Sequence, residues 1–175
     1  WEPLEAEARE AGVTSFCSKP LFMSELREAL TTTRKTVKKE QQNIANYDFT
    51  GKKILLVEDN PLNLEIAAEI LQEVGLIVDT ANDGDVAIEK LRNAAKGQYD
   101  LVLMDVQMPK LDGYTATKEI RTLDNPYAAN LPIIAMTANA FEEDKKKSFE
   151  AGMNGHLSKP IEIDKLMEVL KCNLK

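Results

Sequence analysis

Hydrophobic and polar positions follow two different periods along most of this chain. Short runs rich in Val, Ile and Leu predict five strands, at residues 52–59, 76–82, 99–105, 131–138 and 155–160. Apolar residues three and four positions apart predict five helices, at residues 61–75, 83–97, 112–123, 141–152 and 162–175. Strand and helix therefore alternate five times from residue 51 onward.

This alternation predicts an α/β fold with a parallel sheet, because parallel strands need crossover connections that helices usually supply. The strands at 52–59, 99–105 and 131–138 are apolar almost throughout. Continuous apolar runs are typical of central strands that are covered on both faces. We therefore expect helices on both sides of the sheet.

One segment of the chain occurs twice. Residues 10–30 and 150–170 align without gaps and share Glu, Ala, Gly, Ser, Lys, Pro and Leu at equivalent positions. A repeat at this spacing indicates two large units rather than a solenoid. Lys19 corresponds to Lys159, but the strands that would complete a sheet around Lys19 are missing. We therefore interpret residues 1–30 as the C-terminal fragment of an upstream unit.

Residues 31–50 form a polar segment rich in Lys and Gln, which we expect to be a helical or flexible linker before a complete unit at 51–175. Some apolar positions alternate three and four apart, as in a coiled coil, but Thr33 and Glu40 are poor core residues. A solvated linker helix and a helix that forms a dimer are the two interpretations.

Composition and charge limit the partners and the cellular location that this chain can have. A net charge of −7 argues against nonspecific nucleic-acid binding. No apolar run approaches the roughly 20 residues that span a bilayer, and no secretory signal is present. We expect a cytoplasmic location, with Cys17 and Cys172 reduced rather than paired. Since the chain does not begin with Met, we expect a longer parent, whose membrane anchoring stays open.

Chemically capable residues follow the strands where each strand ends. They are Glu58 and Asp59 after the first strand, Asp105 at the third, Thr137 at the fourth and Lys159 at the fifth. Ligands bind parallel sheets at the carboxyl ends of the strands, near the point where strand order reverses. We therefore expect these side chains to meet at one edge.

The three acids of this set predict a cation site. Clustered carboxylates repel one another, and a divalent cation relieves the repulsion. A few oxygen ligands with room for water and phosphate suit Mg²⁺, with Mn²⁺ as the alternative. Lys159 offers a charge and Thr137 a hydroxyl to phosphate oxygens. This set fits Asp105 as a nucleophile that becomes an aspartyl phosphate.

Four strings, "LLVEDN", "LVLMDVQMPKLDG", "IIAMTANA" and "HLSKP", resemble in order and spacing the receiver domains of two-component response regulators. The resemblance covers residues 53–174. The residues of these motifs are most similar to those of receivers attached to hybrid sensor histidine kinases. It implies a flavodoxin-like, doubly wound sheet of five parallel strands in the order 2-1-3-4-5. Together with residues 1–30, it implies a kinase parent with two receivers in tandem.

The resemblance also implies metal and phosphoacceptor roles. Asp105 matches the phosphoacceptor, and Glu58 and Asp59 match the acid pair that binds Mg²⁺. Gln107 matches the position whose backbone carbonyl reaches the metal. Gln107 and Asn139 occupy positions that influence the lifetime of the aspartyl phosphate in the family.

Further roles concern phosphate contact and switching. Lys159 matches the phosphate contact, and the family has a cis bond before the residue equivalent to Pro160. Thr137 matches the switch hydroxyl. His156 occupies the second switch position, where the family often has Tyr or Phe. A rotamer switch and a half-exposed strand residue are the two interpretations of His156.

The implied function is a phosphorelay module, not an enzyme in the ordinary sense. It would take a phosphoryl group from a phosphohistidine on a histidine kinase or a phosphotransfer domain, with no nucleic-acid or membrane contact. One alternative is an Asp-nucleophile phosphatase of the haloacid-dehalogenase type, but its D-x-D motif is replaced here by adjacent acids. Another is a degenerate protein-binding scaffold, although all five site positions are filled.

Overall fold

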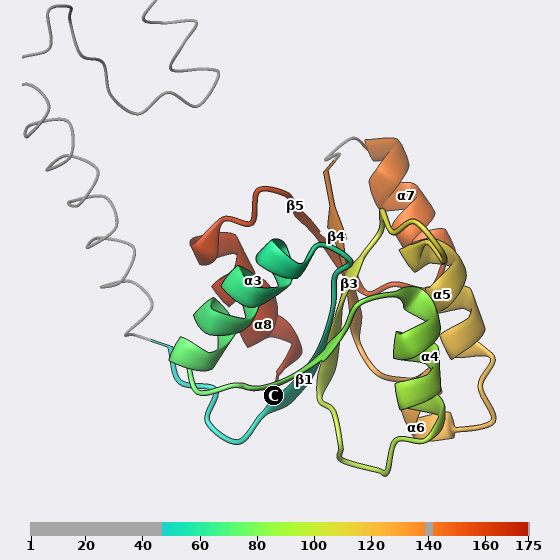
Figure 1. The fold of residues 1–175 in the computed structure, drawn as a ribbon, viewed down its shortest axis with the longest axis horizontal. Helices are drawn as coiled ribbons and strands as arrows, with labels where there is room; N and C mark the ends of the chain where they lie inside the picture. Colours follow the sequence, from blue (N-terminus) through green and yellow to red (C-terminus); the bar gives the residue numbers. More distant parts are fainter. Residues whose placement is uncertain (1–46, 139–141, 175) are drawn as a thin grey trace, which may run out of the picture. The chain divides into compact units, whose positions relative to one another are not determined.

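Five parallel strands form the central sheet, in the order β2-β1-β3-β4-β5 (Figure 1). The computed structural model describes residues 47–138 and 142–174. The strands are β1 (Lys53–Val57), β2 (Ile77–Ala81), β3 (Leu101–Asp105), β4 (Ile133–Thr137) and β5 (Gly155–Ser158). This order and direction confirm the predicted fold, a doubly wound α/β sheet.

The apolar runs occupy the middle of the sheet, as their composition predicts. Every residue of β3 and β4 is buried, and in β1 only Lys53 is exposed. The edge strand β2 is less apolar, and most of its residues are half-buried or exposed. Continuous apolar runs therefore mark the strands that are covered on both faces.

Helices cover both faces of this sheet. The described helices are α3 (Pro61–Glu73), α4 (Gly84–Arg92), α5 (Gly113–Arg121), α6 (Pro126–Ala129), α7 (Glu142–Glu150) and α8 (Ile163–Asn173). Figure 1 shows α3 and α8 on one face and α4, α5 and α7 on the other. The crossover from β1 to β2 thus places α3 on one face, and the later crossovers run in the opposite direction and place α4, α5 and α7 on the other face, as a doubly wound sheet requires.

Three helices begin at side-chain caps that follow the carboxyl ends of strands. Asn60, Asp83 and Asp112 accept hydrogen bonds from backbone N–H groups in the first turns of α3, α4 and α5. Since each cap comes after a strand end, the N-termini of these helices lie at the same edge of the sheet. That edge also carries the predicted acids.

Strand alternation decides which side chains face which helices. Leu55 and Val57 belong to the core cluster formed with residues of α4 and α5, whereas Ile54 and Leu56 are buried outside that cluster. Successive side chains of a strand point to opposite faces. Glu58 continues the alternation of Ile54 and Leu56, which directs its carboxylate toward the α3 side.

The structure corrects several predicted boundaries. Strands β1 and β5 end at Val57 and Ser158, so Glu58, Asp59 and Lys159 lie in the loops just after the strands. Helix α6 was not predicted, because its four residues are too few to show a helical period. These shifts leave the site residues at the predicted edge.

The described chain begins with a segment that is attached to the domain. Phe49 is buried, and its N–H donates to the carbonyl of Val74 at 2.8 Å. The ring of Tyr47 stacks on Phe49 with 6.2 Å between ring centres. Residues 47–49 have no regular secondary structure.

Several predictions lie outside the described residues. They concern the upstream fragment at 1–30, most of the linker at 31–50, and Asn139. Cys172 is described, and it is an exposed free thiol. Among the residues that the structure describes, no helix is both long and apolar enough to cross a bilayer.

Candidate functional site

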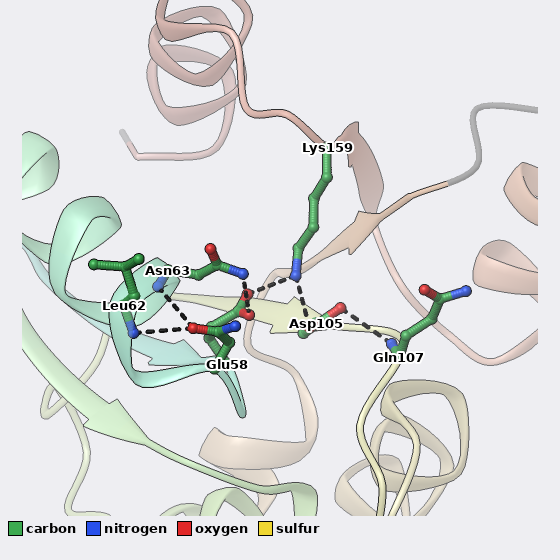
Figure 2. A network of polar contacts seen from close by, with 7 residues as sticks. Glu58, Leu62, Asn63, Asp105, Gln107 and Lys159 are labelled. Carbon is green, nitrogen blue, oxygen red and sulfur yellow. Dashed lines mark hydrogen bonds and ion pairs between the residues drawn. The ribbon is translucent and has the colours of Figure 1, made fainter.

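Asp105 is the last residue of β3, at the centre of the sheet edge, and only 3% of it is exposed. Its Oδ1 accepts a hydrogen bond from the backbone N–H of Gln107 at 3.0 Å. Its Oδ2 lies 2.6 Å from the ammonium Nζ of Lys159 (Figure 2). Both oxygens of this buried carboxylate are therefore held in place.

Glu58 and Asp59 bring two further carboxylates to Asp105. One oxygen from each of the three residues can be chosen so that all lie within 4.8 Å of one another. Glu58 is buried, whereas Asp59 is exposed. The strand order explains the meeting, since β1 and β3 are neighbours and the crossover direction reverses between them.

Lys159 joins two of these acids. Its Nζ lies 2.6 Å from Glu58 Oε2 and 2.6 Å from Asp105 Oδ2. The backbone places it, because the Lys159 N–H donates to the carbonyl of Thr137 at 2.7 Å and so extends the pairing of β4 and β5. The peptide bond from Lys159 to Pro160 is cis, as the resemblance implies.

Burial and charge act together on these groups. Burial raises the pKa of Asp105, and the charge of Glu58 adds to it, while Lys159 and the Gln107 N–H only partly offset the rise. Burial alone would lower the pKa of Lys159, but its bonds to Asp105 and Glu58 outweigh this and raise the pKa. Lys159 therefore stays charged at neutral pH.

The donor set fits a divalent cation. Three carboxylates cluster here and the ammonium of Lys159 contacts two of them, which leaves an excess of two negative charges when all are ionised. Lys159 already places a cationic group against two of the acids, which shows that this position attracts positive charge. Oxygen ligands of this kind suit Mg²⁺. The residues present thus fit the predicted metal.

The two predicted switch residues, Thr137 and His156, differ in how far they are buried. Thr137 is the last residue of β4, is 4% exposed and pairs with Ser158 in the sheet register. It therefore lies at the same edge as Asp105. His156 is half-buried within β5, opposite Ala135, and is not part of the acid cluster.

One polar neighbour of the site was missed in the sequence. The side-chain amide of Asn63, in the first turn of α3, donates to Glu58 Oε1 at 3.0 Å. A signal was available, because the cap at Asn60 places Asn63 in the first turn, where a side chain can reach back toward the preceding strand end.

An apolar groove of about 290 Å³ adjoins Glu58 and Lys159. It lies between α3 and the connection from β5 to α8, and its apolar lining comes from Ile66, Ala67, Ile70, Pro160, Ile161 and Leu166. On α3, Leu62 and Ile66 are 63% and 49% exposed. The charged site therefore continues into an apolar surface.

Comparison with known proteins identifies the family. The model of the response regulator receiver domain matches residues 54–171. A hybrid signal transduction histidine kinase L of Dictyostelium discoideum is 38% identical over 120 residues, which are 68% of this chain and 7% of that protein. The chain spans between 7% and 15% of the length of the curated relatives that head the comparison.

Solved structures similar to this chain are receiver domains as well. The receiver domain of sensor histidine kinase PA1611 from Pseudomonas aeruginosa, with magnesium in its active-site cleft, is 40% identical, with a TM-score of 0.64 over 71% of this chain and 98% of that one. The receiver domain of Ssk1 from Saccharomyces cerevisiae, crystallised with the phosphotransfer protein Ypd1, is 28% identical, with a TM-score of 0.65 over 72% and 90% of the two chains. This chain belongs to the response regulator receiver domain family.

Proposed function

We propose that this chain is a phosphoacceptor module of a two-component phosphorelay, in which Asp105 receives the phosphoryl group. The observation that carries the proposal is the buried carboxylate of Asp105, which lies against Lys159 and two further acids at the edge of the sheet. The domain is not a conventional enzyme, because the group that it accepts and later loses is bound to its own Asp105. Family membership also argues against the phosphatase alternative.

We propose Glu58, Asp59 and Asp105 as ligands of Mg²⁺, with the backbone carbonyl of Gln107 as a further ligand and Mn²⁺ as a substitute ion. The chemistry of the three carboxylates supports this assignment. When bound, the ion would neutralise the acids and stabilise the charge that develops on the transferred phosphoryl group.

The transfer itself requires mainly positioning and charge neutralisation. One carboxylate oxygen of Asp105 attacks the phosphorus of a phosphohistidine. The new P–O bond forms as the P–N bond breaks, and the leaving imidazole keeps that electron pair and takes up a proton from water. Lys159, already within 2.6 Å of Asp105, would hold a phosphoryl oxygen. Hydrolysis by water, or transfer to a second histidine, later removes the group.

We propose that Thr137 then follows the phosphoryl group and that His156 shifts with it. Their places in β4 and β5 support this role, because Thr137 is at the edge beside Lys159 and His156 is two residues before Ser158. A change at this edge can then alter the packing around β5. Gln107 and Asn139 are proposed to tune the lifetime of the aspartyl phosphate.

The apolar groove is our proposed docking surface for the phosphodonor, a histidine kinase or a phosphotransfer protein. It adjoins Glu58 and Lys159, so a partner seated there would place a histidine near Asp105. The co-crystal of an Ssk1 receiver with a phosphotransfer protein supports a partner of this class. Exposed apolar residues on α3 would supply the contact area.

We further propose that the parent is a hybrid histidine kinase with two receivers, of which residues 1–30 are the end of the first, 31–50 the linker and 51–175 the second. The repeat and the kinase relatives support this organisation. A cytoplasmic location belongs to the same proposal, and so does a dimer through the linker as the alternative to a solvated helix.

Intact mass measurement tests the phosphoacceptor role. The chain is incubated with Mg²⁺ and acetyl phosphate, and we expect one added phosphoryl group that disappears with time. The Asp105→Asn variant should remain unlabelled, since the amide is not a nucleophile of this kind. Unlabelled wild type would contradict the proposal and favour the scaffold alternative, and equal labelling of the variant would show that a residue other than Asp105 accepts the phosphoryl group.

A second experiment tests the docking surface. The variants Ile66→Asp and Ile77→Asp each introduce a charge at a similarly exposed isoleucine, but only Ile66 lines the groove. We expect Ile66→Asp to slow transfer from a phosphorylated histidine phosphotransfer protein while labelling by acetyl phosphate stays normal. Equal transfer rates for the two variants would exclude this groove.

A further inference from the structure

The carboxylate of Glu58 is bound on both sides by donors of different kinds. Glu58 is only 3% exposed. Its Oε2 lies 2.6 Å from the Lys159 ammonium, and its Oε1 accepts from the side-chain amide of Asn63 at 3.0 Å (Figure 2). One oxygen thus faces the shared cluster, and the other faces α3.

The start of α3 determines where Asn63 lies. The side chain of Asn60 accepts hydrogen bonds from the backbone N–H groups of Leu62 at 3.0 Å and Asn63 at 3.3 Å. This cap fixes the first turn of the helix directly after Asp59. Figure 2 shows the Asn63 side chain extending from that turn to Glu58.

We propose that Asn63 is a positioning residue of the metal site, which holds Glu58 so that Oε2 faces Asp105 and the cation. This inference rests on the proposed Mg²⁺ site. A neutral amide suits the task, because it satisfies a buried carboxylate oxygen without adding positive charge. The excess negative charge of the three acids is thereby kept for the cation.

The physical reason is the freedom of a glutamate side chain. Glu58 has three rotatable bonds, and ordering such a side chain costs free energy. Without Asn63, Oε1 would be a buried acceptor that lacks its partner, and such a group is expensive to leave unpaired. Loss of a hydrogen-bond partner behind a metal ligand typically weakens metal affinity about 10- to 100-fold.

The inference is tested by titrating the isotope-labelled full chain with Mg²⁺ and measuring the affinity from the changes in NMR chemical shifts. Asn63→Leu keeps the approximate shape and removes the donor, and Asn63→Ala is a second variant in case the first perturbs the fold. We expect an affinity for Mg²⁺ about tenfold weaker than wild type. Gln72→Leu, an exposed amide at the other end of α3, is the matched control and should bind like wild type.

A double-mutant cycle shows whether Asn63 acts through Glu58. In a Glu58→Ala background the amide has lost its partner, so Asn63→Leu should change Mg²⁺ affinity by less than about twofold, because the coupling has been removed. Urea unfolding of each variant shows that the fold is kept. A purely structural role would predict the same loss in both backgrounds.

The outcomes separate the two proposals. If wild type binds no Mg²⁺, the metal site of the proposed function fails. If wild type binds but Asn63→Leu and Asn63→Ala bind equally well, or lose the same affinity in the Glu58→Ala background, the positioning role of Asn63 is overturned.

Discussion

A single ammonium group, that of Lys159, lies between the carboxylates of Glu58 and Asp105, whose side chains are each only 4% exposed. In a Lys159→Met variant, Glu58 and Asp105 would face each other without a cation. Breaking a buried charge pair by removing one partner costs about 3 kcal/mol or more. We expect a loss of this size in the free energy of unfolding, measured with urea in the presence of a chelator.

Added Mg²⁺ should recover much of that loss, because an ion that binds only the folded state stabilises it by mass action. Lys165→Met is the control, since Lys165 and Glu162 form an exposed pair on the surface. Exposed pairs contribute about 0 to 1 kcal/mol. A Lys159→Met variant that is as stable as the control, or that does not respond to Mg²⁺, would show that Lys159 does not compensate the two buried carboxylates.

Gly113 illustrates how a residue without a side chain supports the site. A Cβ at this position would lie 2.2 Å from the carbonyl oxygen of Asp105. The backbone N–H of Gly113 also donates to the carbonyl of Val106 at 3.0 Å. The first turn of α5 therefore packs directly on the end of β3.

We expect Gly113→Ala to lower the free energy of unfolding by about 2 to 3 kcal/mol, because the backbone must move to admit the methyl group. Labelling of Asp105 by acetyl phosphate should slow as well. Gly97→Ala is the comparison: Gly97 has φ of 85° but open space around it, so only conformational strain of about 1 kcal/mol applies. Urea unfolding that ranks Gly97→Ala as the worse variant would refute this packing argument.

At the scale of elements, the guanidinium of Arg121 ties the end of α5 to its neighbours. It donates to the carbonyls of Gly152, Ala129 and Leu131 and to Asn154 Oδ1, at 2.9 to 3.0 Å. These partners belong to α6, to the segment before β4 and to the turn before β5. One planar group therefore fixes three connections.

Arg121→Lys keeps a positive charge but cannot reproduce this planar fork of donors. Burial lowers the pKa of Arg121, so this charge is poorly solvated and depends on its partners. We expect a loss of about 2 to 3 kcal/mol in the free energy of unfolding, because hydrogen bonds to a charged group are lost. Arg92→Lys, at an exposed position, should change it little. Thermal unfolding checks both variants, and equal midpoints would count against the proposed role.

A second polar network connects β2, α4 and the segment before β3. Tyr99 donates from its hydroxyl to Asp79 Oδ2 at 2.5 Å, and Lys90 lies 2.6 Å from Asp79 Oδ1. Burial, together with the bond to Asp79, raises the pKa of Tyr99 to about 12. An unfolded tyrosine ionises near pH 10, so the folded state releases this proton only at a higher pH.

The sign of the pH effect follows from this difference. Below about pH 10 the contribution of Tyr99 is fully present, and between about pH 10 and 12 it is lost as pH rises, because only the unfolded chain has released the proton. We expect wild type to lose more stability across this window than Tyr99→Phe. Urea unfolding at several alkaline pH values measures the two slopes, and parallel slopes would show that Tyr99 is not responsible.

The type of each long element could be predicted from the sequence, but its ends could not. Continuous apolar runs identify β1, β3 and β4, yet strand length depends on pairing with a neighbour, as when β1 stops at Val57 opposite Ala81. The same limit applies to α6, whose four residues carry a cap at Asn125 but no period. Local patterns thus identify elements, and tertiary contacts set their bounds.

At the scale of the whole molecule, the edge of the site was predictable because parallel strands end on one side of the sheet. Glu58, Asp105 and Lys159 were found in this way. The contact from Lys159 to Glu58 spans 101 positions, and its geometry depends on the register of β4 with β5. The cap at Asn60 indicates that Asn63 lies in the first turn of α3. The hydrogen bond from Asn63 to Glu58 was still missed, because no period or motif shows which way that turn faces.

The proposed phosphorylation of Asp105 can be tested by direct chemistry. An aspartyl phosphate is an acyl phosphate, and borohydride reduces it to the alcohol, which converts the aspartate to homoserine. The full chain is phosphorylated with acetyl phosphate and Mg²⁺, reduced, digested and sequenced by mass spectrometry. We expect homoserine at position 105 and no reduction of any other acidic side chain. Reduction to the alcohol at Asp59 (homoserine) or at Glu58 (the alcohol one carbon longer), or no reduced residue at all in a chain that carries a phosphoryl group, would show that Asp105 is not the acceptor.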